Sequence, residues 1–102
     1  MKKYKKKAII IEALQYTGKN FKECYNFAGK SIEKETKDGI IIITLEGNHL
    51  CKKGDFIVRG IKGEFYPCKP DIFSETYEEV WITSFFLHRY LVVPNLYFHL
   101  KL

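Results

Sequence analysis

Apolar and polar positions alternate along this chain in short segments that are separated by glycine-containing turns. Residues 8–16, AIIIEALQY, begin with β-branched isoleucines and then switch between apolar and polar positions, which is typical of a strand partly buried on both faces. The dipeptide Asp38-Gly39 is a strong hairpin signal, because the tight type I′ turn requires positive φ at both central residues. Together with the turn candidates Glu46-Gly47, 53–55 and 60–63, it separates predicted strands at residues 31–37, 40–43, 49–52, 56–59 and 64–68.

Two short helices are predicted among these strands. Asn20 can cap the first helix, with Glu23 in the capping-box position, and Gly29 provides the left-handed stop. Pro70-Asp71 opens a second helical segment, in which Asp71 favours the positive end of the helix dipole. The apolar residues that suggest helical spacing in this second segment are Ile72, Phe73, Tyr77 and Val80.

The order of these elements predicts an α+β fold. Consecutive strands joined by tight turns pair antiparallel, because a parallel crossover needs about a dozen or more residues. We therefore expect a small, partly curled antiparallel sheet of about five to six strands, with one short helix in the N-terminal half and a second after residue 70. Pro67 marks the end of an edge strand. Residues 1–80 would form one compact domain with a basic arm at 1–7, and residues 81–102 an apolar C-terminal extension.

The positive charge is concentrated at the N-terminus. The 102 residues include 17 Lys and Arg against 12 Asp and Glu, and the five lysines within residues 2–7 account for the whole excess of +5. The remainder of the chain is neutral, which argues against a uniformly basic nucleic-acid binder. The arm itself has two interpretations, a flexible solubilising end or a segment that grips phosphates while Tyr4 stacks on a base.

Cysteine usage and the C-terminal composition favour a cytoplasmic protein without a membrane span. The three cysteines are widely spaced and form no C-x-x-C pair, which argues against both a disulfide framework and a zinc ribbon. His88, Arg89, Pro94 and Asn95 interrupt the apolar C-terminal stretch, so no run of about 20 apolar residues remains to span a bilayer.

The sequence contains no recognisable catalytic motif. It has no Ser/His/Asp arrangement with a nucleophile context, no phosphate-binding G-x-x-x-x-G-K-[ST] and no H-E-x-x-H. His49, His88 and His99 lack the spacing of metal ligands. Glu75 and the pair Glu78-Glu79 are explained by a solvated helix face. We therefore expect a protein without enzymatic activity, metal or cofactor.

Cations and aromatic residues occur together within residues 54–80, a combination that suits a ligand with both a phosphate and a ring. Strand alternation places Phe65 and Tyr66 on opposite faces, and we expect Phe65 in the core and Tyr66 at the ligand. The candidate binding residues are Tyr4, Tyr16 and Tyr66 for base stacking, Lys6, Lys7, Arg59, Lys62 and Lys69 for phosphates, and Gln15 and Glu64 for ribose or base edges.

Two blocks of the sequence resemble a family of small proteins of tailed phages and prophages. The first is residues 4–18, YKKKAIIIEALQYTG, and the second is residues 54–80, where GEFYPCKPDIF followed by TYEEV is the specific part. Residues 81–102 depart from this pattern, since such proteins usually end soon after the TYE element. The resemblance implies a phage accessory protein expressed in the bacterial cytoplasm during infection.

The leading hypothesis for function is a counter-defence protein that binds and sequesters a cyclic nucleotide immune signal without catalysis. It rests on analogy with small phage proteins of similar build, such as the anti-CBASS class of sponges. The alternatives are an inhibitor that binds a host defence protein directly and a weak single-stranded nucleic-acid binder that uses the lysine arm. We also expect a homo-oligomer, because the tail carries more large apolar side chains than a monomer of this size leaves in water. The expected interface residues are Trp81, Phe85, Phe86, Leu91, Tyr97 and Phe98.

Overall fold

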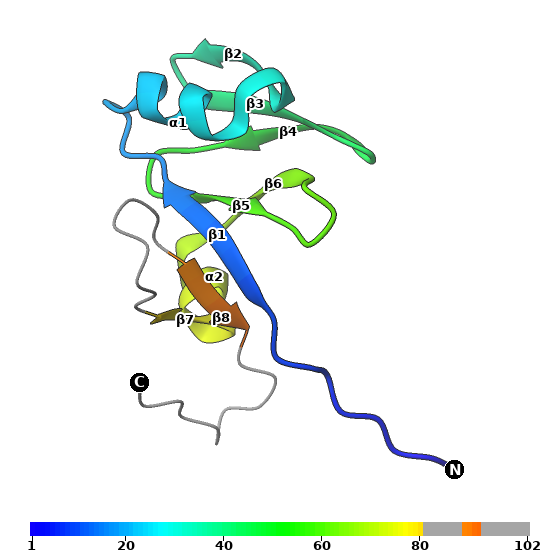
Figure 1. Ribbon diagram of the computed structural model, residues 1–102. Coiled ribbons are helices and arrows are strands. Elements are labelled where there is room, and N and C mark those ends of the chain that lie inside the picture. The colour runs from blue at the N-terminus through cyan, green and yellow to red at the C-terminus, as the bar shows by residue number, and fades with distance from the viewer. Residues whose placement is uncertain (81–88, 93–102) are drawn as a thin grey trace.

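The computed structural model describes residues 1–80 and 89–92, which form an α+β fold (Figure 1). The first half contains β1 (Ile10–Gln15), α1 (Phe21–Ala28), a 3₁₀ turn (Gly29–Ser31), β2 (Ile32–Thr36), β3 (Gly39–Thr44) and β4 (Gly47–Cys51). The second half contains β5 (Phe56–Arg59), β6 (Phe65–Cys68), α2 (Pro70–Thr76), β7 (Tyr77–Val80) and β8 (Arg89–Val92). The predicted fold class is confirmed, and the turn residues separate the strands as their glycines indicate.

The strands form two antiparallel sheets, where the sequence suggested one. The larger sheet has the order β6-β5-β1-β8-β7 and the smaller one the order β2-β3-β4, so the described residues hold eight strands in place of five or six. The additional strands are β7 and β8. The division into two sheets arises between β4 and β5, because the turn that joins them does not close a hairpin. After this turn β5 pairs with β1, with Leu14 opposite Ile57. Neither sheet closes into a barrel.

The second helix is shorter than the sequence spacing indicated. It ends at Thr76, and Tyr77–Val80 continues as strand β7, which pairs with β8. Glu78 and Glu79 therefore lie on a strand, so the prediction of a solvated helix face was wrong for these two residues. The apolar spacing of Tyr77 and Val80 suits a helix, but β8, which begins nine positions after Val80, provides this segment with a partner strand.

Part of the expected C-terminal extension belongs to the larger sheet. Strand β8 lies between β1 and β7, and Leu91 occupies the register positions opposite Ile10 and Glu78. The other predicted interface residues lie outside the described residues: Trp81, Phe85, Phe86, Tyr97 and Phe98.

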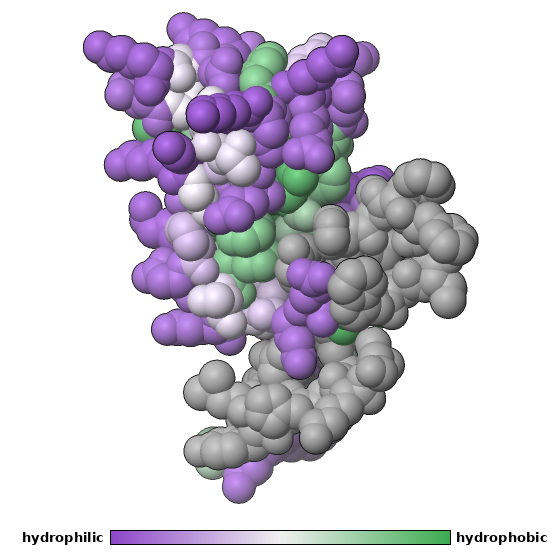
Figure 2. All heavy atoms as spheres, turned by 90° about the vertical axis from the view of Figure 1, so that its left-hand side faces the viewer, coloured by the Kyte–Doolittle hydropathy of each residue, from purple (hydrophilic) through white to green (hydrophobic). Residues whose placement is uncertain are grey.

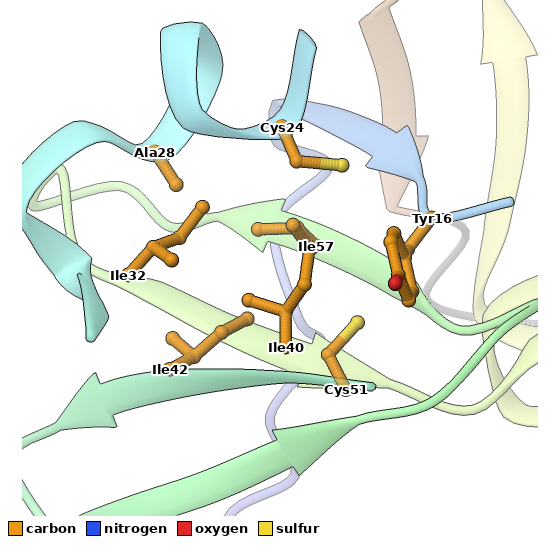
Figure 3. Close-up of a cluster of buried hydrophobic side chains, with 8 residues drawn as sticks. All are labelled: Tyr16, Cys24, Ala28, Ile32, Ile40, Ile42, Cys51 and Ile57. Carbon is orange, nitrogen blue, oxygen red and sulfur yellow. The ribbon is translucent and has the colours of Figure 1, made fainter. Parts of the chain in front are cut away.

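Two apolar clusters lie on opposite faces of the β1–β5 strand pair. Ile57 belongs to the first cluster and Val58 to the second, as expected for successive residues of a strand, and neither is exposed. The first cluster joins α1 and the smaller sheet to β1 and β5 (Figure 3), and the second packs α2 against β1 and β5. Its core members are Ile11, Ala13, Val58 and Phe73, whereas the first consists of Tyr16, Cys24, Ala28, Ile32, Ile40, Ile42, Cys51 and Ile57.

The N-terminal arm is an extended segment at the surface of the molecule. Residues 1–8 are all exposed, and they lead away from the start of β1 (Figure 1). Within the described residues, neither helix has the length and apolar character needed to cross a bilayer.

Candidate functional site

The structure disperses the predicted binding residues over several parts of the molecule. Gln15 and Tyr16 lie at the C-terminal end of β1, whereas the arm residues precede its other end. The residues around the β5–β6 turn and those near α2 form two further groups. The arm group is Tyr4, Lys6 and Lys7, the turn group is Arg59, Lys62 and Glu64, and the group near α2 is Tyr66 and Lys69.

Tyr16 is a core residue. Only 4 % of it is exposed, and its ring lies within the first cluster, so neither ring face is open to a base. Its hydroxyl donates a hydrogen bond of 2.8 Å to the Glu35 carboxylate. Burial and this carboxylate raise the pKa of Tyr16 to about 12. Its neighbour Gln15 is exposed and uses its side-chain amide to donate a 2.9 Å hydrogen bond to the Gly54 carbonyl.

Phe65 and Tyr66 lie on opposite faces of β6, as strand alternation predicts. Phe65 packs against the first cluster, with its ring 5.3 Å from that of Phe27 and nearly perpendicular to it. Tyr66 packs against the second cluster, and its hydroxyl lies 3.3 Å from that of Tyr77. Burial of Tyr66 and the hydrogen bond to Tyr77 raise its pKa well above the usual range. Tyr66 is therefore half-buried, and its ring contributes to the packing of the second cluster.

Two of the charged side chains around the β5–β6 turn, Arg59 and Glu64, contact neighbouring residues of the structure. Arg59 is half-exposed and lies 3.9 Å from the Glu12 carboxylate. A side chain at Gly60 would overlap the Glu64 carboxylate, which shows that this carboxylate lies over the turn. Arg59 and Glu12 line a cavity of about 250 Å³ at this end of the sheet. Lys62 is exposed in the turn, and Lys69 is exposed immediately before α2.

Three turns gather at the other end of β1 and form a polar cavity of about 400 Å³, which we call the lysine pocket. The turns follow β1, join β2 to β3 and join β4 to β5, and all three lie on the left-hand side of Figure 1. Each contributes one lysine: Lys19, Lys37 and Lys53. The face that Figure 2 shows is predominantly hydrophilic at the level of these turns. The other lining residues are Tyr16, Thr17, Gly18, Glu35, Thr36, Asp38 and Gly39.

Glycines allow the three turns to approach one another. Gly39 has a φ of +144°, and a side chain there would overlap the Cys51 carbonyl oxygen, so the β2–β3 turn packs directly on the end of β4. Gly18 has a φ of +88°, and a Cβ on it would lie 3.3 Å from the Cδ of Lys53. The stem of Lys53 therefore crosses Gly18. Backbone hydrogen bonds also fix the β4–β5 turn to β1, including one of 2.7 Å from Gly54 N–H to the Tyr16 carbonyl.

The lysine pocket carries more positive than negative side chains. Three lysines line it against the two carboxylates Glu35 and Asp38. Glu35 already accepts the Tyr16 hydroxyl, which fixes its position at the pocket wall. Within residues 1–80, the structure shows no ion pair for the three lysines. The arrangement can bind an anion through the ammonium groups and hydroxyl groups through the carboxylates.

Sequence reasoning did not identify these three lysines, although a signal exists. Each lies within two positions of a turn glycine, in the segments Thr17-Gly18-Lys19, Lys37-Asp38-Gly39 and Lys53-Gly54. The glycines were recognised as turn residues, but the convergence of the three turns depends on the pairing of β1 with β5. The sequence does not display that pairing, because the two strands are distant along the chain.

A second, larger cavity of about 580 Å³ lies between the β3–β4 hairpin and β6, and we call it the apolar groove. Of the predicted site residues, Glu64 and Tyr66 line it. Its other lining residues are Ser31, Ile43, Thr44, Leu45, Glu46, His49, Phe65 and Pro67.

Among the residues that the structure describes, no group of three or more potential metal-ligating side chains is found. No protein-family model matches the chain, and comparisons with characterised proteins and with solved structures gave no significant similarity.

Proposed function

We propose that the protein binds a cyclic nucleotide in the lysine pocket and sequesters it without transforming it. The observation that carries this proposal is the convergence of Lys19, Lys37 and Lys53, from three separate turns, on one cavity of about 400 Å³. A cyclic nucleotide carries phosphodiester anions, and ammonium groups are suitable partners for them. The volume lies within the range of about 300–1,000 Å³ that is usual for small-molecule sites.

The carboxylates of the pocket suit the ribose rather than the base. Glu35 and Asp38 can accept hydrogen bonds from ribose hydroxyls, and the contact with Tyr16 keeps Glu35 in place. Tyr16 is the one aromatic residue in the lining, and its buried ring presents no face for stacking. We therefore expect the pocket to recognise phosphate and ribose with little discrimination between adenine and guanine.

The biological setting of this proposal is the one that the resemblance to phage proteins suggests. A phage accessory protein in the bacterial cytoplasm that holds a cyclic nucleotide alarm signal would keep it from the host effector. Such a sponge needs tight binding, and it needs no nucleophile or general base.

Isothermal titration of the full chain against a panel of cyclic di- and trinucleotides tests the proposal. We expect saturable binding of at least one ligand, with adenine and guanine forms within about threefold, because the base makes no stacking contact. The variant Lys37→Gln/Lys53→Gln should bind at least about tenfold more weakly, which corresponds to about 1.4 kcal/mol. The matched control is Lys22→Gln/Lys30→Gln, which removes the same charge from exposed positions outside the pocket.

The outcomes separate the proposal from its competitors. An absence of heat with every ligand would contradict it, and an equal loss in both double variants would show a general charge effect in place of a site. Recovery of a chemically altered ligand after incubation would contradict sequestration without catalysis. Binding of single-stranded oligonucleotides that weakens steeply with salt and requires residues 1–7 would favour the nucleic-acid alternative.

A further inference from the structure

The apolar groove lies between two strands that form sheet edges in the described part of the chain. Strand β4 ends the smaller sheet and β6 ends the larger one. Leu45 on one side of the groove is fully exposed and Ile43 is 46 % exposed, while Phe65 and Pro67 line the other side. Single exposed apolar residues are ordinary, but a cavity lined by several of them is typical of a binding surface.

The rim of the groove is acidic. Glu46 and Glu64 both line it, and no lysine or arginine does. His49 and Tyr66 are the remaining titratable residues in the lining. A complementary occupant would combine a large apolar or aromatic group with several positive charges.

The N-terminal arm of this chain has that chemistry. It places Tyr4 among five lysines, and Tyr4 is 90 % exposed. The arm is extended, so its first eight residues can span about 25 Å. It leaves the molecule from the start of β1, and the exposure of Tyr4 shows that the arm does not fill the groove of its own copy (Figure 1).

We propose that the arm of one copy docks in the apolar groove of a second copy. The ring of Tyr4 contacts the apolar side chains of the groove, and the arm lysines lie against Glu46 and Glu64. An extended arm can also form backbone hydrogen bonds with β4 or β6, each of which is the last strand of its sheet among the described residues. The groove is separate from the lysine pocket, because the two cavities lie at opposite ends of β3. The pocket includes Gly39 at the start of this strand, and the groove includes Thr44 at its end.

Sedimentation velocity of the full chain over a range of concentrations tests this contact. We expect reversible self-association that weakens with salt, because the lysine–carboxylate contacts are exposed. Tyr4→Ser and Leu45→Glu should each weaken it at least about tenfold, since each removes one side of the apolar contact. The matched controls are Tyr25→Ser and Ile72→Glu, at residues that are about half-exposed and lie outside the groove, and they should leave it unchanged.

A charge variant tests the acidic rim separately. Glu46→Lys should weaken the self-association, whereas Glu75→Lys on α2 makes the same change at an exposed position outside the groove and should not.

Each contrary result excludes a definite part of the proposal. A monomer at every concentration would overturn it, as would association that survives both Tyr4→Ser and Leu45→Glu. Loss in Leu45→Glu with none in Tyr4→Ser would show that something other than the arm fills the groove. Equal losses in the variants and their controls would indicate non-specific association.

Discussion

Gly39 is the residue on which the shape of the lysine pocket most depends. Its φ of +144° disfavours any other residue, and its missing side chain allows the β2–β3 turn to contact the Cys51 carbonyl. A larger residue must separate the turn that carries Lys37 from the end of β4. Both the backbone conformation and the close contact with Cys51 therefore require glycine at position 39.

We expect Gly39→Ala to lower the free energy of unfolding by about 2–4 kcal/mol, because it combines backbone strain with overlap. The matched control is Gly47→Ala, since Gly47 also has a positive φ, of 111°, but a Cβ there would have no neighbour within 4 Å. This control should lose only about 1–2 kcal/mol, the usual cost of a left-handed backbone. Urea denaturation of both variants measures the difference, and equal losses would show that the contact with Cys51 is unimportant.

Also at the residue scale, the sequence predicted where a side chain lies when local backbone geometry alone determines its direction. The opposite orientations of Phe65 and Tyr66 follow from strand alternation, and the structure confirms them. The placement of Tyr16 in the core could not be recognised, because the cluster that buries it includes Cys51 on β4 and Ile57 on β5, which are distant in sequence. Burial by distant segments is not visible in a local pattern.

At the scale of elements, the α2 helix is held mainly by one side chain. Phe73 is buried, and its ring stacks on that of Phe56, with centroids 3.8 Å apart and planes within 4°. It also lies 4.9 Å from the ring of Tyr77 on β7. A helix of seven residues has little intrinsic stability, so this packing must hold it against the sheet.

Phe73→Ala should therefore lower the free energy of unfolding by about 3–5 kcal/mol, as large-to-small changes in aromatic cores do. Ile72→Ala is the matched control, because Ile72 is the adjacent helical residue and is half-exposed, and we expect a loss below about 1 kcal/mol. Thermal or urea denaturation compares them. Similar losses for the two variants would show that the stacked rings do not anchor α2.

The elements themselves could be predicted wherever a turn glycine marks their ends. The segment Tyr77–Val80 could not, because its apolar spacing fits a helix and its strand partner is β8. The position of β8 within a sheet was equally hidden, since it lies inside a long apolar stretch. Local patterns thus predict secondary structure well until a strand outside the segment provides its hydrogen bonds.

At the scale of the whole molecule, the division into two sheets follows from pairings that the sequence does not show. Strands β1 and β5 are separated by α1 and the entire smaller sheet, yet they form the layer on which both clusters pack. The lysine pocket exists because this pairing brings the end of β1 to the β4–β5 turn. The lysine pocket could therefore be found only with the structure, although its three lysines lie next to turns that the sequence predicts.

The first cluster also links the stability of the whole molecule to alkaline pH. Burial, followed by nearby carboxylates, raises the pKa of Cys24 from 9.0 to about 11. Burial and the nearby Asp55 carboxylate raise the pKa of Cys51 from 9.0 to about 12. Burial and Glu35 raise the pKa of Tyr16 from 10.0 to about 12. These groups lie on α1, β4 and the end of β1 (Figure 3), so exposing them requires the elements to separate.

Below about pH 8 these groups are protonated in both states, and pH has no effect through them. Between about pH 8 and 12 the unfolded chain releases protons that the folded chain retains, so the free energy of unfolding should fall as the pH rises. Urea denaturation at pH 8, 9, 10 and 11 measures this slope, and Cys24→Ala/Cys51→Ala should make it shallower even if that variant is less stable at pH 8. A stability that stays constant over this range, or an unchanged slope in the variant, would show that the buried thiols do not couple folding to pH.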